Sequence, residues 1–397
     1  MVKPKTNRSV TIFTAETYPS VAGDGRNALL IGSKLKESGK ILKLICLNPK
    51  GKLPKTEIIN GVEVIRICYK YNSLLGRVVY RFTLWWFLVM QLKGSSTWII
   101  YGAMPGYRTI IAVSLLKRVK CVFRSTLWGF DDAQSLTGKP YRIFTRFLLS
   151  RIYGYYAINS WFAGTWQKVF GASNILQTFQ GVDIKKYDIK LKNAIRQNLR
   201  SKLQVADDCF VILMVGHLIK RKGFPEIAEW LSRIEDDFLL LHVGSSAAPD
   251  WDTMNRHNDE MNIIKKTVAL RLEDRVKFMG RQENMVEFYL SADVLLVASY
   301  AEGFPPNSVN EALAAGLPVL TRRIPGVADV IADGVNGYVF SNEHEFTQKL
   351  STLIHNPLRL KELGRNARIF AEDKLGVGKV TDSIQVFLNH PTGKKAF

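Results

Sequence analysis

Residues 299–318 read S-Y-A-E-G-F-P-P-N-S-V-N-E-A-L-A-A-G-L-P and follow the apolar run D-V-L-L-V-A at 293–298. The length and β-branched content of that run predict a buried parallel strand, and the residues after the turn favour a helix. In open α/β sheets, ligands bind where a parallel strand ends, and the N–H groups at a helix start favour phosphate. Glu302 and Glu311 flank the turn, and carboxylates accept charge-assisted hydrogen bonds from hydroxyls. The stretch therefore predicts a site for a ligand with both phosphates and hydroxyls.

The pattern Ser-x-x-Glu-Gly-Phe-Pro, then Glu-Ala-x-Ala-x-Gly-x-Pro-Val, resembles the donor-sugar motif of glycosyltransferase family 4. Members of that family are retaining group 1 glycosyl transferases of the GT-B fold. The resemblance implies that Glu302 contacts donor-sugar hydroxyls and that Glu311 holds the nucleotide ribose. It also implies that the backbone of Gly303, Phe304 and Pro305 faces the sugar and the phosphate.

The spacing of this motif departs from the family. Eight residues separate Glu302 from Glu311, whereas the family usually has seven, and we interpret the difference as one residue inserted in the turn. The insertion leaves open the sugar preference and the separate roles of Pro305 and Pro306. An ordinary turn before a capped helix is the alternative interpretation.

A second motif, G-H-L-I-K-R-K-G at 216–223, follows another apolar strand-like run. Such a turn offers backbone N–H groups and clustered cations to a diphosphate. The usual family form is Gly-Arg-Leu-x-x-x-Lys-Gly, so the resemblance assigns Lys222 to the diphosphate, with Arg221 as a substitute cation. His217 stands where the family has Arg, and we place it with Gly216 among the donor-binding residues. A cluster of surface basic residues without a ligand is the alternative.

The resemblance supplies three more donor-binding candidates. Arg281 is placed near the nucleotide base, and Gly23 and Gly25 are placed in a long first loop that faces the donor phosphate and the acceptor. We expect the helix after that loop to begin near Asn27. The loop also spells Gly-x-Gly-x-x-Ala, but a dinucleotide fingerprint needs its first glycine directly after the strand and an acidic residue ending the second strand. The sequence meets neither condition, so we do not expect NAD binding.

The length of 397 residues exceeds that of one typical domain. We expect an α/β protein with an acceptor-side domain at 1–200 and a nucleotide-sugar-binding domain at 201–397. The GT-B resemblance implies two doubly wound Rossmann-like domains that face each other across a cleft, and the last helix is a candidate to pack back on the first domain. Four cysteines lie singly in apolar runs, which predicts reduced, buried thiols and neither zinc nor disulfides. These are Cys46, Cys68, Cys121 and Cys209.

The charge is unevenly distributed along the chain. Residues 1–205 hold 33 Lys and Arg against 9 Asp and Glu, a balance of +24, whereas the remainder holds 22 against 26. Such a half should attract an anionic partner: nucleic acid, an acidic acceptor or the cytoplasmic face of a membrane. The apolar run near the N-terminus, 10–13, is too short for a signal peptide or a membrane span.

Two apolar-basic segments bear on the choice of partner. Residues 74–92 are apolar nearly all round, but only 82–92 run without a charge, whereas a span needs about 20 residues. The segment predicts either a buried core helix or a helix in a membrane interface. Residues 139–151 predict an amphipathic helix whose basic side is either solvated or in contact with a membrane. Its basic residues are Lys139, Arg142, Arg146 and Arg151.

The segment W-G-F-D-D at 128–132 carries two further points. The family commonly has His before this glycine, near the reacting sugar, and Trp128 leaves that role open. The pair Asp131-Asp132 could suggest a metal, but the family uses none, so a helix N-cap is the better interpretation. We expect neither a metal nor another cofactor.

Together these features predict a retaining glycosyltransferase that moves a hexose-type sugar from a nucleotide sugar to a lipid-linked or polysaccharide acceptor in lipopolysaccharide, capsule or exopolysaccharide biosynthesis. We expect a cytoplasmic enzyme, peripheral on the inner face of the membrane, with electrostatic assistance to the leaving nucleoside diphosphate and no nucleic-acid partner. A nucleotide-sugar epimerase of the same fold and a basic nucleic-acid-binding protein remain alternatives. The latter gives the paired glutamates no role. The residues do not reveal the donor sugar, the base (UDP or GDP), the acceptor or the oligomeric state.

Overall fold

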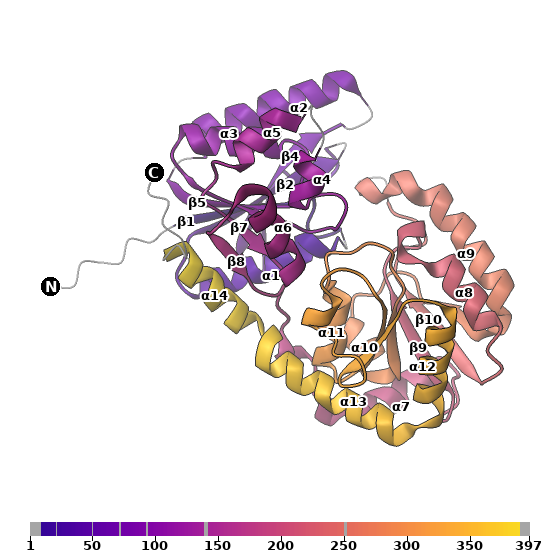
Figure 1. The fold of residues 1–397 in the computed structure, drawn as a ribbon. Helices are drawn as coiled ribbons and strands as arrows, with labels where there is room; N and C mark the ends of the chain where they lie inside the picture. The colour runs from indigo at the N-terminus through magenta and orange to yellow at the C-terminus, as the bar shows by residue number, and fades with distance from the viewer. Residues whose placement is uncertain are drawn as a thin grey trace. The chain divides into compact units, whose positions relative to one another are not determined.

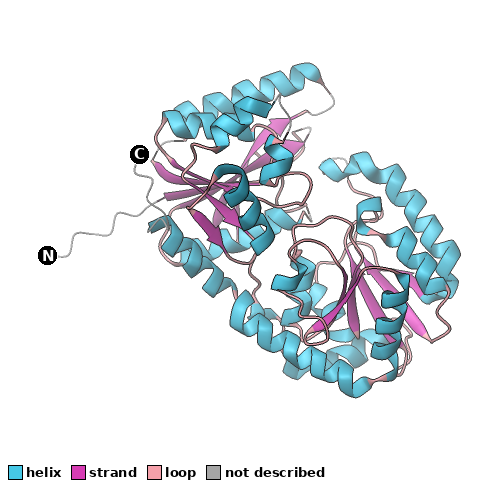
Figure 2. Cartoon of the chain, in the orientation of Figure 1, coloured by secondary structure: helices cyan, strands magenta, loops and turns pink. Residues whose placement is uncertain are grey.

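The computed structural model describes residues 9–20, 22–49, 51–70, 73–92, 94–138, 142–249 and 252–389. It divides into two compact units, Met1–Gly181 with Val377–Phe397, and Val182–Gly376 (Figure 1). Helices surround a central sheet in each unit (Figure 2). Lys93, which follows the first apolar-basic segment, and Lys139, which begins the second, lie outside the described residues.

The first unit is built on a parallel sheet in the order β3-β4-β2-β1-β5-β6-β7-β8, with only β3 antiparallel to its neighbour among the described strands. Successive side chains of a strand point to opposite faces, so Ile12 and Phe13 of β1 enter separate hydrophobic cores. The strands are Ser9–Phe13 (β1), Leu42–Pro49 (β2), Thr56–Ile59 (β3), Val62–Tyr69 (β4), Ser95–Tyr101 (β5), Lys120–Arg124 (β6), Gly154–Ala157 (β7) and Ile175–Gln177 (β8).

Helices cover both faces of this sheet. They are Gly23–Glu37 (α1), Leu74–Trp86 (α2) continued by the π-helical turn Phe87–Gln91 (η1), Tyr107–Leu116 (α3), Ala133–Thr137 (α4), Ile143–Leu149 (α5), Ser160–Phe170 (α6) and Val377–Asn389 (α14). The last of these, α14, contacts α1 and β8 and belongs to the first unit. We expected the boundary at residue 200, but the structure places it at Gly181, because the helix at 192–202 packs on the second unit.

The second unit has a parallel sheet in the order β11-β10-β9-β12-β13-β14. The strand order reverses between β9 and β12, and such a switch point is where doubly wound sheets bind ligands. The strands are Phe210–Val215 (β9), Phe238–Val243 (β10), Val276–Phe278 (β11), Val294–Val297 (β12), Val319–Arg322 (β13) and Gly337–Phe340 (β14). The helices are Lys192–Lys202 (α7), Phe224–Ser232 (α8), Asn258–Leu272 (α9), Met285–Ser291 (α10), Asn307–Ala314 (α11), Glu343–His355 (α12) and Pro357–Phe370 (α13).

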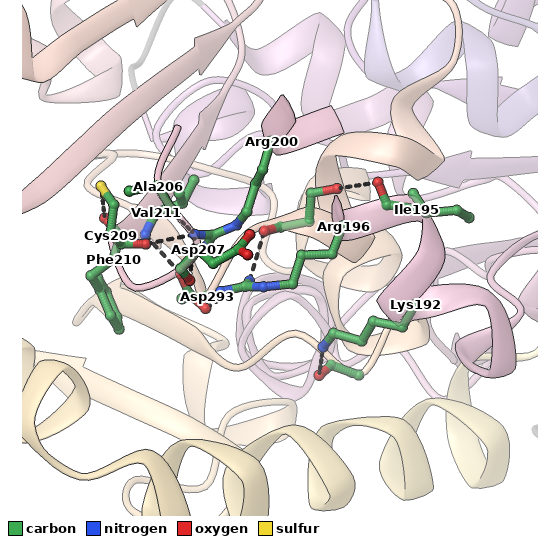
Figure 3. Close-up of polar contacts among 12 residues, drawn as sticks. Lys192, Ile195, Arg196, Arg200, Ala206, Asp207, Cys209, Phe210, Val211 and Asp293 are labelled. Carbon is green, nitrogen blue, oxygen red and sulfur yellow. Dashed lines mark hydrogen bonds and ion pairs between the residues drawn. The ribbon is translucent and has the colours of Figure 1, made fainter. Parts of the chain in front are cut away.

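An ion-pair network fastens α7 to the amino ends of β9 and β12 (Figure 3). Asp293 pairs with Arg200 at 2.7 Å and with Arg196 at 2.8 Å, and it accepts a hydrogen bond from Val211 N at 2.7 Å. The Arg200 guanidinium also donates to three backbone carbonyl oxygens, those of Ala206, Asp207 and Cys209. The charged segment that we expected to be a linker is therefore part of the second unit.

Two expectations about apolar residues need correction. The helix predicted at 74–92 forms, and of its two alternatives the buried core helix is wrong, because only one narrow stripe packs on the rest of the first unit. Cys46 and Cys121 are buried as expected, and burial raises the pKa of each thiol to about 12. Cys68 is exposed, because it lies near the end of β4 where the strand leaves the core.

Candidate active site

Two turns meet at the carboxyl ends of β9 and β12, the neighbouring strands at the switch point. Gly223 ends the first turn with a φ of 74°, and a Cβ atom there would lie 2.4 Å from the carbonyl oxygen of Ala298. Only glycine allows this approach. Tyr300 N in the second turn donates to Arg221 O at 2.9 Å. The two motifs, 80 residues apart in sequence, therefore form one structure.

Glu302 is the centre of this structure. Its buried carboxylate pairs with Lys222 Nζ and, at 3.1 Å, with Arg221 Nη1, and it accepts a hydrogen bond from Ser299 Oγ at 2.8 Å. Arg221 Nη1 also donates to Ala301 O at 2.6 Å. The structure thus brings together all three residues predicted to be catalytic, Lys222, Arg221 and Glu302.

The electrostatics of the cluster keep Glu302 ionised. Burial alone would raise the pKa of this carboxyl, but the charges of Lys222 and Arg221, with the hydrogen bonds from Lys222 and Ser299, lower it to about 2. A buried carboxylate between two cations accepts hydrogen bonds at every physiological pH.

Two histidines, His217 in the turn after β9 and His242 in β10, differ in role. His242 Nε2 lies 2.8 Å from Gly216 O, and burial lowers the pKa of His242 to about 4, so a neutral ring donates to that carbonyl oxygen and fixes the turn. Burial also lowers the pKa of His217, against the opposing effect of Asp252. His217 Nδ1 is buried and has no hydrogen-bond partner within the described residues.

The glycine-proline turn lies in the interior of the second unit. Gly303, Phe304 and Pro305 are all buried, and the Phe304 ring lies wholly in the interior. Glu311 is half-buried on α11, which begins at Asn307 and is the helix predicted after the turn.

Sequence reasoning missed Asn310, which lies beside Glu311 on α11. It is fully buried, and neither of its side-chain polar atoms has a hydrogen-bond partner in the part of the chain that the structure describes. Buried amides are almost always satisfied, so an orphan next to a predicted ribose contact is consistent with a ligand site. An asparagine among apolar helix residues is a signal that could have pointed to it.

Residues 195–370 match the family model described as Glycosyl transferases group 1. The match falls within the second unit, and we call the matched region the group 1 domain. This confirms the predicted glycosyl transferase resemblance, and the two Rossmann-like units confirm the predicted GT-B fold.

Individual relatives agree with this assignment. The capsular polysaccharide biosynthesis glycosyltransferase CapM of Staphylococcus aureus is 24% identical over 234 residues, which are 57% of this chain and 56% of CapM. The chain spans about half the length of the curated relatives it matches. Among solved structures, Anabaena HepE in complex with UDP-glucose aligns with a TM-score of 0.72 at 16% identity, covering 96% of this chain and 99% of HepE. WaaG, a glycosyltransferase involved in lipopolysaccharide biosynthesis, aligns with a TM-score of 0.69 at 19% identity, covering 96% of this chain and 100% of WaaG.

One predicted donor-binding residue of the group 1 domain lies away from the Glu302 cluster. Arg281 is exposed and follows Gly280 at the carboxyl end of β11, two strands from β9. The carbonyl oxygen of Gly280 accepts from Gly244 N at 2.9 Å, which holds the loops after β10 and β11 together.

Gly23 and Gly25 belong to the first unit, outside the group 1 domain. Both lie in the first turn of α1, which begins at Gly23 rather than near Asn27, so the predicted loop ends earlier than we expected. A Cβ atom at Gly25 would lie 1.7 Å from the carbonyl oxygen of Glu16. Close packing of the preceding loop against the helix therefore explains Gly25 without a ligand.

The first unit also contains buried charges that sequence reasoning missed. Arg124, at the end of β6, is fully buried, pairs with Asp24 at 3.2 Å and donates to Gln180 Oε1 at 2.9 Å. Trp128 packs edge-on against Trp161, with 6.2 Å between the ring centroids.

The acidic pair 131–132 serves local structure. Asp132 accepts from Ser135 N at 2.9 Å as the N-cap of α4, which confirms the predicted cap. Asp131 accepts from Thr126 N and Leu127 N, yet burial raises its pKa to about 6. In the described ranges, no group of three or more His, Cys, Asp or Glu side chains could hold a metal ion.

Proposed function

We propose that this protein is a retaining glycosyltransferase that moves a hexose-type sugar from a nucleotide-sugar donor to a glycan or lipid-linked acceptor. The observation that carries the proposal is the cluster of Lys222 and Arg221 on Glu302 at the switch point of a group 1 glycosyl transferase domain. An epimerase would share the fold, but it would form product without an acceptor.

Lys222 and Arg221 bind the donor diphosphate in this proposal. When the bond between the sugar and the phosphate breaks, negative charge grows on the leaving nucleoside diphosphate, and preorganised cations stabilise that charge. Glu302 positions both cations before the donor arrives, because its carboxylate bonds each of them. The neutral ring of His217 contributes a hydrogen bond rather than a charge, next to the backbone of Gly216.

Glu302 has a second role toward the donor sugar. It remains ionised at neutral pH and can accept hydrogen bonds from sugar hydroxyls while the cations turn toward the phosphates. Glu311 binds the ribose, the backbone of Gly303 to Pro305 faces the sugar and phosphate, and Arg281 lies near the base. No metal or other cofactor takes part.

The donor and the acceptor are proposed from the relatives. HepE was crystallised with UDP-glucose, so UDP is the first base to test, with GDP as the second. CapM acts in capsular polysaccharide biosynthesis and WaaG in lipopolysaccharide biosynthesis, which supports an acceptor in a cell-surface glycan. Such acceptors are carried on lipids, so we place the enzyme at the cytoplasmic face of a membrane as a peripheral protein. Within the described residues, no helix is long and apolar enough to cross a membrane.

A thermal-shift panel of nucleotide sugars tests the proposal. A ligand at 100 times its dissociation constant stabilises the folded protein by about 2.7 kcal/mol, so the true donor should raise the melting temperature measurably. The same donor should then lose its sugar only when an acceptor extract is added. Product formed without acceptor would support the epimerase, and a panel without any shift would overturn the proposal.

A further inference from the structure

The outward face of α2 and η1 is an exposed apolar surface. Leu74 and Leu75 are each 72% exposed, Phe82 is 64% exposed and Trp86 is 46% exposed. We call this surface the α2 face; it consists of Leu74, Leu75, Val78, Val79, Phe82, Trp85, Trp86 and Met90. Large contiguous apolar patches are rare on soluble monomers and mark binding surfaces.

The α2 face lies opposite the stripe that holds the helix to the protein. Tyr80, Leu84 and Leu88 are buried and recur every four residues, so they form one narrow line along the helix. At 3.6 residues per turn, Phe82 and Trp86 point away from that line. Folding explains the buried stripe, but it does not explain the wider apolar face that remains outside.

A second exposed apolar group lies on α5. Ile143, Phe144 and Phe147 are exposed, whereas Leu148 and Leu149 pack inward. Helix α3 contacts both α2 and α5, and Figure 1 shows the three helices together on the first unit. The first unit therefore presents apolar side chains from neighbouring helices.

The charged side chains on these helices are all basic. Between Glu63 and Asp183 the sequence has 15 Lys and Arg and only two acidic residues, Asp131 and Asp132, which are both buried. Arg77 and Arg81 are exposed on α2. The guanidinium of Arg151, two residues after α5, lies 4.3 Å from the centroid of the Phe147 ring. No carboxylate on these helices can offset the positive charge.

We infer that the α2 face, with the exposed side chains of α5, docks on the surface of an anionic lipid bilayer. Apolar and tryptophan side chains enter the interface, and arginines at its edge contact lipid phosphates. A second copy of this chain would bring like charges together, and a neutral protein surface would not use the arginines. The inference rests on the membrane placement in the proposed function and names the surface that makes the contact. The α2 face lies in the first unit and the donor cluster in the second, so the two proposals are tested separately.

Vesicle flotation of the whole protein tests the inference. The probes are vesicles of phosphatidylcholine alone and of phosphatidylcholine with phosphatidylglycerol. One variant replaces apolar anchors, Phe82→Gln with Trp86→Gln, and its matched control makes the same change at Ile263 and Leu270, exposed residues of α9. Another replaces Arg77 and Arg81 by Gln, with Lys361→Gln and Arg365→Gln on α13 as a control of equal charge. Arg146 is avoided because it donates to Val169 O and lies over the Phe170 ring.

Wild-type protein should float with the anionic vesicles at low salt and bind neutral ones much more weakly. The Phe82/Trp86 variant and the Arg77/Arg81 variant should each lose about tenfold in affinity or more, and both controls should bind like the wild type. Nucleoside diphosphate binding should stay unchanged in all four, so failure of the donor proposal would be seen separately. Equal binding to neutral vesicles, no binding to either, or a dimer that the Phe82/Trp86 variant dissociates would overturn the inference.

Discussion

The second unit holds two carboxylates, each between two cations, at opposite ends of the same pair of strands. Asp293 lies at the amino ends of β9 and β12 with Arg196 and Arg200, and Glu302 lies after their carboxyl ends with Arg221 and Lys222. Both carboxylates are shielded from solvent. The surroundings of the cations differ, and that difference separates a structural network from a candidate active site.

At Asp293, both terminal nitrogens of the Arg200 guanidinium bond acceptors of the protein. Arg200 is 3% exposed and donates to three backbone carbonyl oxygens besides its carboxylate (Figure 3). At Glu302, Lys222 has one hydrogen-bond acceptor within the described residues, the carboxylate itself, and is 17% exposed. A lysine with unused donors at a switch point can turn to a ligand at little cost, whereas Arg200 cannot.

The largest expected effect is on stability, at the amino-end cluster. Arg200→Ala removes the buried cation that pairs with Asp293 and leaves three carbonyl oxygens without their hydrogen-bond donor. The free energy of unfolding should therefore fall by about 3–5 kcal/mol. Arg196→Ala is the matched control and should cost about 1 kcal/mol, because Arg196 is 26% exposed. Chemical denaturation measures both. Equal losses of unfolding free energy from the two variants would show that the hydrogen bonds from Arg200 to the three carbonyl oxygens add no stability beyond the ion pair.

The next effect is on turnover, at the carboxyl-end cluster. Lys222→Ala should lower turnover by about 10²–10³, the scale for removing one preorganised charge-stabilising donor. Lys220→Ala, an exposed lysine of the same turn, is the control and should change turnover less than twofold, roughly the effect of one distant screened charge. Initial rates with the donor found in the thermal-shift panel measure this. A Lys222→Ala enzyme that keeps more than half of the wild-type activity would refute the proposal that Lys222 stabilises the leaving nucleoside diphosphate.

Substitutions of the two glutamates should differ in whether they weaken the binding of free nucleoside diphosphate. Glu302→Gln should lower transfer by about 10–100-fold, through lost charge-assisted bonds to the sugar and lost positioning of Lys222, yet leave nucleoside diphosphate binding nearly unchanged. Glu311→Gln should weaken both, because the ribose is present in either ligand. Calorimetric titration with free nucleoside diphosphate tells them apart. Equal loss of nucleoside diphosphate affinity in the two variants would refute the division of roles.

The pKa of Glu302 predicts a pH dependence of stability. The folded-state pKa of about 2 lies below the ordinary value of 4.5, so ionised Glu302 stabilises the fold above the ordinary value, and this contribution is lost as the pH falls toward 2. Relative to Glu302→Gln, the wild type should be more stable by about 1–3 kcal/mol near pH 5, and the difference should shrink steadily below about pH 4. Denaturation of both proteins across this range measures it. A difference independent of pH would mean that Glu302 is not held ionised by its partners.

The smallest effect is expected at His217. Its lowered pKa makes the ring neutral at pH 7, so His217→Gln removes no charge and should weaken nucleoside diphosphate binding by less than about tenfold, the value of one neutral hydrogen bond. The comparison is with Lys222→Ala in the same binding assay. A loss at His217 as large as that at Lys222 would show that the histidine binds in its charged form.

The two turn motifs at 216–223 and 299–306 were predictable because their information is local. The run ending at Ala298 reads as a buried strand, and Gly223 needs a positive φ, so each turn could be recognised from its own residues. The helix at 74–92 was recognisable as a helix, but its exposure was not. An apolar residue looks the same in sequence whether it faces a core or solvent, and only the position of Tyr80 and Leu84 against the sheet shows which stripe is inside.

The sequence by itself predicted the α/β class, the two-domain organisation, the resemblance to group 1 glycosyl transferases and the candidate residues Lys222, Arg221 and Glu302. These follow from strand periodicity, turn chemistry and motif spacing, which are properties of neighbouring residues. Only the tertiary structure decided that Glu302 bonds both cations, that Asn310 is buried without partners and that the α2 face is exposed. Each of these depends on contacts between residues far apart in the chain, and such contacts exist only once β9 and β12 are paired and α2 is packed on its sheet.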